Sequence, residues 1–192
     1  NIVDLFIFSL SHSFVCFESL SLLIVNNIKI INGNVNNYKL IEKIFTNSNK
    51  DNKIITGLIN NAGIAFPKKI EKLDYKKLLN TFQVNFFAPA ILTKEVLKLM
   101  KKNNYGRIIN ISSGGAVNCV ENYFSYSASK AALNTLTKTL SKEIKKKNIK
   151  INSMSPGPCK TAMFPKNKLS TRLSLPTIKY LASLGPNGPT GK

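Results

Sequence analysis

The sequence predicts an α/β fold in which the strands of a doubly wound parallel sheet alternate with helices. Short apolar runs bounded by turn residues are typical of buried strands, and they occur at residues 28–31, 54–59, 108–111 and 150–155. Segments with apolar residues at helical spacing lie between them, at about residues 39–45, 80–100 and from residue 124 onward. A helix between successive strands favours a parallel sheet with helices on both faces.

The length and composition are those of one folded domain. The chain has 192 residues, of which 43% are hydrophobic, enough to bury a core. Its net charge is +19, and a strongly positive net charge is also typical of nucleic-acid-binding proteins. However, the excess is almost all lysine, with arginine only at Arg107 and Arg172, whereas base recognition favours arginine. We therefore expect no nucleic-acid partner and attribute the many lysines to AT-rich coding.

Cysteine and histidine usage predicts neither a disulfide framework nor a metal site. Cys16, Cys119 and Cys159 are far apart and lack metal-ligand spacing, and His12 is the single histidine. This pattern favours a reducing, cytoplasmic compartment. Residues 1–24 are apolar, but charged residues and serines interrupt them and no basic segment precedes them, so we expect neither a membrane span nor a secretory signal.

A long amphipathic helix is predicted at about residues 80–100, following a helix start at the N-capping residue Asp74. Its predicted buried side comprises Val84, Phe87, Ile91, Leu92, Val96 and Leu99. Phe86, Ala90 and Leu97 lie away from this stripe and are predicted on the outer face. Asn85 falls within the apolar portion, where a buried amide needs hydrogen-bond partners.

Residues 107–138 carry the most specific pattern in the chain. Ser113 follows a buried strand, and Tyr126 and Lys130 lie four residues apart on one face of the next helix. An ammonium near a phenol favours the phenolate and lowers the phenol pKa from its usual value of about 10. Such a pair can protonate a carbonyl oxygen while a hydride reaches the carbonyl carbon, and Ser113 can hold the same oxygen in line.

Three motifs, in their order along residues 28–192, resemble the short-chain dehydrogenase/reductase family. They are Asn-Asn-Ala-Gly at residues 60–63, a serine followed by Tyr-x-x-x-Lys at residues 113–130, and Pro-Gly-x-x-x-Thr at residues 156–161. Taken alone, the first motif also fits an ordinary turn rich in Asn and Gly. The second also fits a helix that happens to carry a tyrosine and a lysine. The resemblance implies a Rossmann-like sheet and NAD(P)-dependent reduction of a ketone or aldehyde. Residues 177–192 resemble the ending of carbonyl-reductase members, with a helix that stops near residue 184 and then a Gly-Pro turn.

The resemblance also implies a role for each matching residue. Tyr126 is the expected acid/base, Lys130 the modulator of its pKa and a ribose ligand, Ser113 the residue that positions the carbonyl, and Asn85 a support of the proton relay. The residues expected to bind the cofactor, NADP or else NAD, are Asn34, Asn61, Ala62, Gly63, Tyr126, Lys130, Pro156, Gly157 and Thr161. Asn34 stands where the family usually has an aspartate near the adenine.

The glycine-rich turn that holds the cofactor phosphate in this family has no counterpart in the sequence. No glycine precedes Gly33, and too little chain lies before residue 34 for a strand and such a turn. We therefore expect one partial domain, residues 1–192, in which residues 1–27 are divergent and the first and last strands of the sheet are missing. Within the divergent part, residues 4–11 are predicted as a strand and residues 14–24 as a helix.

Two functions remain open from the sequence. The first is a reductase acting on a small carbonyl or alcohol substrate, whose identity the sequence does not define. The second is an inactive fragment or non-catalytic relative that keeps a helical dimer surface without binding the cofactor. For either, the two long helices predict a homodimer or homotetramer, because members of the family associate through them.

Overall fold

The computed structural model describes residues 4–9, 27–32, 39, 42, 55–144 and 148–192, and its strands form one parallel sheet. The strand order is β2-β1-β3-β4-β5. The strands are β1 Asp4–Ser9, β2 Asn27–Asn32, β3 Ile55–Asn60, β4 Gly106–Ile111 and β5 Ile149–Met154. The predicted α/β class is confirmed, and the strands predicted at 28–31, 54–59, 108–111 and 150–155 are each present within two residues.

Strand β1 lies inside the sheet, between β2 and β3. It pairs in parallel with β2 from Asp4 with Asn27 to Ser9 with Asn32, and on its other side with β3. The sequence predicts a gap at this place, but residues 4–9 fill it, so β3 has neighbours on both sides. The chain passes from β1 outward to β2 and then to β3 on the opposite side. The carboxyl ends of β1 and β3 therefore border a topological switch point, where ligands of such sheets bind.

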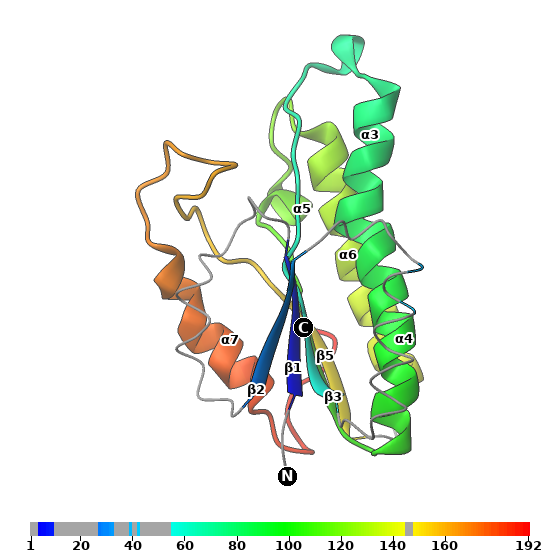
Figure 1. Cartoon of the computed structure of the whole chain (residues 1–192). Helices are drawn as coiled ribbons and strands as arrows, with labels where there is room; N and C mark the ends of the chain where they lie inside the picture. The colour runs from blue at the N-terminus through cyan, green and yellow to red at the C-terminus, as the bar shows by residue number, and fades with distance from the viewer. Residues whose placement is uncertain (1–3, 10–26, 33–38, 40–41, 43–54, 145–147) are drawn as a thin grey trace.

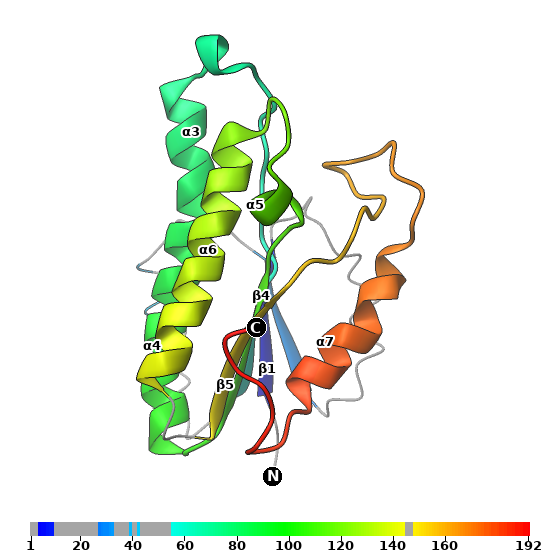
Figure 2. The same ribbon diagram turned by 180° about the vertical axis from the view of Figure 1, so that it is seen from behind.

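Helices cover both faces of the sheet. The helices α3 Tyr75–Phe82, α4 Ala88–Lys102 and α6 Phe124–Glu143 lie on one face, and α7 Leu175–Ala182 lies on the other (Figures 1 and 2). Shorter helical turns are η1 Ile70–Lys72, η2 Gln83–Phe87, α5 Gly115–Asn118 and η3 Thr171–Ser174. This two-sided cover confirms the doubly wound arrangement.

Alternate residues of the central strands supply two separate hydrophobic cores. Leu58, Ile108 and Ile151 pack with residues of α4 in one core. Their neighbours Ile59 and Ile109 pack against α7 in the other. Because successive side chains of a strand point to opposite faces, a strand buried on both sides is largely apolar, and polar side chains within it, such as Asn60 and Asn110, need hydrogen-bond partners.

The predicted long helix at residues 80–100 is divided by a π-helical turn. Asp74 caps α3 as predicted, accepting hydrogen bonds from the amides of Lys76 and Lys77 at 2.8 and 3.2 Å. The turn η2 then separates α3 from α4, and its wider pitch brings Ala88 to the core in place of Phe87. Phe87 is 41% exposed, so its prediction as a core residue is wrong. Val84, Leu92, Val96 and Leu99 are buried as predicted.

Arg107 ties the amino-terminal end of β4 to two distant segments. Its buried guanidinium donates to the carbonyl oxygen of Leu184, after α7, and to the backbone and side-chain oxygens of Asn148. It also lies over the Tyr105 ring, 4.3 Å from the ring centroid. It has no carboxylate partner within the described ranges, and burial lowers the pKa of this guanidinium. The neutral carbonyl acceptors therefore satisfy a buried cation and join the ends of three elements.

The carboxyl-terminal residues lie along the outer edge of β5. The amide of Gly191 donates to the Ile151 oxygen, and the amide of Ser153 donates to the Lys192 oxygen, both at 2.7 Å. The side chain of Asn152 donates to the Pro189 oxygen at 3.0 Å. This edge of the sheet is therefore partly paired.

Some predictions fall outside the described residues. These are the helix at residues 14–24, the adenine-binding role of Asn34 and most of the helix at residues 39–45. Of that last helix the structure describes Lys39 and Glu42, both helical. None of the helices within the described ranges is long and apolar enough to cross a membrane.

Candidate active site

Tyr126 and Lys130 lie one turn apart on α6 and are both buried. Tyr126 is 4% exposed and Lys130 is 3% exposed. The Lys130 Nζ donates a 2.7 Å hydrogen bond to the carbonyl oxygen of Ile111, the last residue of β4, and lies 5.9 Å from the centroid of the Tyr126 ring. The helix thus delivers a phenol and an ammonium to the carboxyl end of the sheet.

Ser113 completes this group from the segment that follows β4. Its hydroxyl lies close enough to the Tyr126 phenol to lower the pKa of that phenol, and it accepts a hydrogen bond from the amide of Gly115 at 3.1 Å. The three residues that the sequence singles out for chemistry, 113, 126 and 130, are therefore brought together. Their meeting requires β4 and α6 to pack side by side, which the spacing in the sequence alone does not specify.

Burial shifts the pKa values of the phenol and the ammonium in opposite directions. It raises the pKa of Tyr126, with a smaller contribution from Tyr123, while the Ser113 hydroxyl lowers it. Burial also lowers the pKa of Lys130 to about 8. The sequence predicts that Lys130 lowers the Tyr126 pKa; in the structure the net shift is upward. The Lys130 ammonium binds the Ile111 carbonyl oxygen and lies 5.9 Å from the Tyr126 ring centroid, and in this arrangement the desolvation of the phenol is the larger effect on its pKa.

Asn85 lies in the π-helical turn and clamps the segment that leaves β3. Its amide oxygen accepts from the backbone N–H of Ile64 and its amide nitrogen donates to the Ile64 carbonyl, both at 2.9 Å. The same nitrogen donates to the Ser129 hydroxyl of α6 at 3.0 Å. Asn85 therefore has the partners that a buried amide needs, and it joins three elements beside Lys130.

Residues 60–63 at the carboxyl end of β3 have two roles: Asn60 joins β3 to the neighbouring elements, and Gly63 lies beside Lys130. The Asn60 side chain donates to the Asn110 oxygen on β4 at 2.7 Å, and Asn110 donates to the Thr137 hydroxyl on α6 at 2.8 Å. This buried network fixes the two strands and the helix relative to one another. Gly63 instead faces the site, since a Cβ built there would lie 3.4 Å from Lys130 Nζ. Asn61 and Ala62 are buried between them.

The segment between β5 and α7 carries the third predicted motif and an additional aromatic side chain. Gly157 has a φ of 78°, a backbone conformation that favours glycine. The Thr161 hydroxyl accepts from the amide of Phe164 at 3.1 Å. The Phe164 ring packs on Tyr126, with 6.3 Å between the ring centroids. The sequence pattern does not predict this contact, and its single signal is an apolar ring amid lysines and asparagines.

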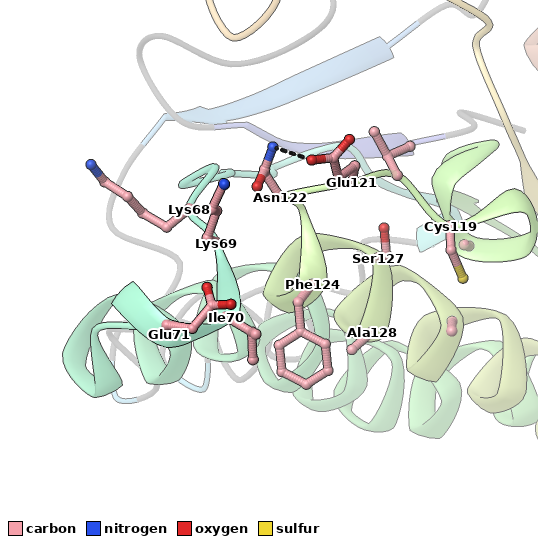
Figure 3. Close-up of a pocket in the computed structure, with 13 residues that line it drawn as sticks. Lys68, Lys69, Ile70, Glu71, Cys119, Glu121, Asn122, Phe124, Ser127 and Ala128 are labelled. Carbon is pink, nitrogen blue, oxygen red and sulfur yellow. Dashed lines mark hydrogen bonds between the residues drawn. The ribbon is translucent and has the colours of Figure 1, made fainter.

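A cavity of about 600 Å³ lies apart from the group of Ser113, Tyr126 and Lys130. It is bounded by residues 68–71, by the loop between α5 and α6 and by the exposed side of α6, including Phe124 and Ser127 (Figure 3). None of Ser113, Tyr126 and Lys130 lines it. The buried Ser127 hydroxyl has no hydrogen-bond partner within the described residues. The described part of the chain also contains no group of three or more His, Cys, Asp or Glu side chains that could hold a metal ion.

Comparison with known proteins explains why these motifs occur in this order. The family model described as short chain dehydrogenase matches residues 17–171. The chain belongs to the short-chain dehydrogenase family. Among curated members, L-xylulose reductase of Caenorhabditis elegans is 38% identical over 103 residues, 53% of this chain and 41% of that protein. The chloroplastic NADPH-dependent aldehyde reductase-like protein of Arabidopsis thaliana is 33% identical over 137 residues, 70% of this chain and 49% of that protein.

Solved structures of a dehydrogenase and a carbonyl reductase share the fold over nearly the whole chain. 4-Hydroxyisoleucine dehydrogenase complexed with NADH has a TM-score of 0.83 at 26% identity, covering 97% of this chain and 94% of that one. Carbonyl reductase Sniffer of D. melanogaster has a TM-score of 0.83 at 23% identity, covering 95% and 93%. The second likeness concerns the fold alone. The chain spans less than half the length of the two curated relatives named above.

Proposed function

We propose that this short-chain dehydrogenase is an NAD(P)-dependent oxidoreductase that reduces a ketone or aldehyde, or oxidises the corresponding alcohol. The observation that carries the proposal is the group formed by the partly buried Ser113 and the buried Tyr126 and Lys130 at the carboxyl end of β4. The names of the xylulose and aldehyde reductases point to the same substrate class. Ligands of open α/β sheets bind at this end.

Tyr126 is the proposed proton donor to the carbonyl oxygen. Its raised pKa keeps the phenol protonated at neutral pH, as an acid requires before it reacts. The Ser113 hydroxyl lies close enough to the phenol to lower its pKa, so an oxygen placed between them can receive hydrogen bonds from both groups. The Lys130 ammonium, one helical turn away, stabilises the phenolate that remains after proton transfer.

Asn85 supports this chemistry by holding the surroundings of Lys130. Its amide fixes the Ile64 backbone and the Ser129 hydroxyl, and its oxygen lies 3.6 Å from a Cβ built on Gly63. The proposed role is to keep open a route by which a proton from solvent reaches Lys130 after each turnover. Loss of Asn85 is therefore expected to affect the proton supply and the local structure together.

The described residues fit the nicotinamide half of the cofactor. Gly63 leaves open the space that a side chain would fill beside Lys130, and Lys130 uses one of its three donors on the Ile111 carbonyl. When bound, the nicotinamide supplies the hydride. The residues proposed to hold the cofactor are Asn61, Ala62, Gly63, Tyr126, Lys130, Pro156, Gly157 and Thr161, with Asn34 outside the described residues. We propose NADP because of the NADPH-dependent relative; the structure complexed with NADH makes NAD the alternative.

A second candidate function is a non-catalytic relative, and a sequence observation favours it. Strand β1 ends at Ser9, and the next glycine is Gly33, so no glycine-rich turn follows β1. Such a turn lets the backbone approach the cofactor pyrophosphate closely. A fluorescence titration with NADPH separates the two candidates, because the reductase requires saturable binding and the non-catalytic relative does not.

The proposed assembly is a homodimer or homotetramer formed through the outer faces of α4 and α6. A groove of about 310 Å³ between these helices is lined by Ala90, Leu97 and Leu136 among others. Leu97, predicted on the outer face, is only 8% exposed and lines this groove. We propose a reducing, cytoplasmic compartment, in keeping with three cysteines that are far apart in the sequence and lack metal-ligand spacing.

The proposed function is tested by removing the phenol oxygen. Tyr126→Phe is expected to lower carbonyl reduction by at least ~100-fold with little change in NADPH affinity, because the phenol acts on the reacting oxygen. Lys130→Met is expected to weaken both activity and NADPH binding. Tyr180→Phe, at a 57% exposed position on α7, is the matched control. Activity of the Tyr126 variant within a few-fold of the parent contradicts the proposal.

A further inference from the structure

The cavity of about 600 Å³ beside α6, here called the α6 cavity, lies between that helix and two other segments. One is the segment 68–71 before α3, and the other is the loop from α5 to α6. The amide of Lys68 in the first donates to the Asn122 oxygen in the second at 2.8 Å. Because a backbone hydrogen bond joins its two sides, the cavity is built into the fold. Its volume falls within the roughly 300–1,000 Å³ that is typical of small-molecule sites.

The wall of the α6 cavity is mainly apolar. Ile70, Val120 and Phe124 line it and are each about half exposed, at 59%, 49% and 52%. Ala128 and Ala131 line it further along α6, where their short side chains leave room. Apolar side chains that gather around one hollow, and are not scattered singly over the surface, are typical of a site that binds a ligand or a partner.

Ser127 places one hydroxyl without a partner in this wall. The residue is 7% exposed, and its Oγ has no hydrogen-bond partner in the part of the chain that the structure describes. The oxygen points from α6 toward the loop that carries Cys119 and Glu121 (Figure 3). Gly115 leaves room beside it, since a Cβ built on that glycine would lie 3.4 Å from the Ser127 Oγ. A buried hydroxyl without a partner costs free energy, and a ligand that bonds to it removes that cost.

The charged residues around the cavity balance one another. Lys68 and Lys69 line it together with Glu71 and Glu121, which gives two cations and two anions. Although the whole chain has a net charge of +19, neither sign is in excess here. An apolar wall with one hydroxyl and no net charge disfavours an ion, because a charged group would lose its hydration without gaining a partner.

We propose that the α6 cavity is a second, non-catalytic binding site, and that its ligand is an uncharged, mainly apolar molecule with one hydroxyl or carbonyl group. The apolar part of the ligand lies against the apolar wall, and its oxygen bonds to the Ser127 hydroxyl, which can donate or accept. The site is separate from Ser113, Tyr126 and Lys130, none of which lines it, and it shares no lining residue with the groove between α4 and α6. The proposal therefore does not depend on the proposed reductase activity.

The Cys119 thiol reports whether the cavity is occupied. It lines the cavity and is exposed, whereas the Cys159 thiol is buried. Alkylation by iodoacetamide in each protein, minus that in the same protein carrying Cys119→Ser, measures this thiol alone. The uncharged probes are 1-octanol and 2-octanone, and octanoate is an anionic probe of the same chain length. We expect the uncharged probes to slow Cys119 alkylation saturably, and octanoate to bind at least roughly tenfold more weakly.

Three variants assign the binding to this cavity. Ser127→Ala is expected to raise the 1-octanol Kd roughly fivefold, because one hydrogen bond to the ligand is lost. The same variant should keep Tm at or above that of the parent, because it removes a buried hydroxyl without a partner. Ala131→Leu fills the cavity and is expected to abolish the protection of Cys119. Thr135→Leu adds the same side chain at an exposed position one turn further along α6, outside the cavity and the groove, and should leave the Kd unchanged.

Each outcome decides the proposal. If neither uncharged probe protects Cys119 saturably, the cavity is not a site for this class of ligand. Equal protection by octanoate overturns the uncharged class. Protection that persists unchanged in Ser127→Ala and Ala131→Leu places the probe elsewhere and overturns the site. A protein that binds 1-octanol in the cavity but reduces no aldehyde supports this site and counts against the reductase alone.

Discussion

Lys130 is buried as completely as the apolar residues around it, so its charge depends on the fold. Burial disfavours the charged form of any group, and it therefore lowers the pKa of this ammonium while raising that of the neighbouring phenol. With a pKa of about 8, Lys130 is protonated at neutral pH and loses its proton within the range where the protein is studied. The same lysine is thus both a participant in the proposed chemistry and a cost to stability.

The first prediction concerns this cost. The Lys130 pKa is about 8 in the folded chain and about 10.4 when unfolded, so between these pH values the unfolded chain binds more protons. The free energy of unfolding must then rise with pH, by about 1 kcal/mol between pH 8 and 9. Urea unfolding of the parent and of Lys130→Met at both pH values measures this term. Contributions from Tyr126 and Cys159 cancel, because both proteins keep these groups.

An equal pH dependence in the parent and the Lys130→Met variant contradicts a buried ammonium. The difference between the two proteins, and not either slope alone, is decisive. Burial raises the pKa of the Cys159 thiol, which has the opposite effect on stability above its unfolded pKa.

The chemistry-bearing residues were predictable because their spacing is local. Tyr126 and Lys130 share a helix face through the helical period, and Ser113 follows a recognisable strand. The partners of Asn85 and the cover supplied by Phe164 were not predictable. Ile64 lies 21 positions from Asn85, and Phe164 reaches Tyr126 from a segment beyond β5. Such contacts depend on how elements pack, which residue type and spacing do not specify.

At the scale of elements, the helix following Asp74 shows how a regular pattern misleads. Apolar periodicity assigns Phe87 to the core because it assumes one pitch throughout. The π-helical turn Gln83–Phe87 changes that pitch and leaves Phe87 41% exposed. The same turn places Asn85 against the Ile64 backbone. The π-helical turn that interrupts the predicted apolar stripe therefore also positions Asn85 in the candidate site. Such turns often occur at functional sites.

The outer faces of α4 and α6 give the second prediction, on association. The groove between them is apolar at Leu97 and Leu136, but Lys94 and Lys98 border it and share one carboxylate, Glu95, at 3.5 and 2.6 Å. Two copies that meet there bring like charges together in a chain of net charge +19. Salt screens this repulsion, so the dimer fraction in sedimentation velocity is expected to increase with ionic strength.

Variants locate the association on this groove. Leu136→Lys adds a cation to it and is expected to keep the protein monomeric at all salt concentrations. Leu173→Lys adds the same charge at a 62% exposed position before α7 and is expected to leave the dimer unchanged. A parent protein that stays monomeric at high micromolar concentration in high salt contradicts the proposed assembly.

At the scale of the whole molecule, the strand order was the feature that the sequence described least well. Residues 4–9 are recognisable as a strand, but their place depends on pairing with residues 27–32 and 55–60. Nothing within the strand itself encodes those partners, and the missing glycine-rich turn suggested that the central strand was absent. The fold class was predictable from the alternation of elements, whereas the occupant of the central position was decided by non-local pairing.

The position of β1 leads to the last prediction, which compares the two ends of the chain. β1 pairs with both β2 and β3, so deletion of residues 1–9 leaves β2 without its one described neighbour and exposes an edge of β3. Deletion of residues 189–192 removes hydrogen bonds only along the outer edge of β5. We expect the first deletion to abolish the cooperative transition in calorimetry and to promote aggregation. The second should keep the cooperative transition and lower Tm by roughly 10–20 °C, because about six hydrogen bonds are lost and each contributes about 1 kcal/mol. A cooperative melt of the first variant near the Tm of the full chain would show that residues 4–9 do not hold the centre of the sheet.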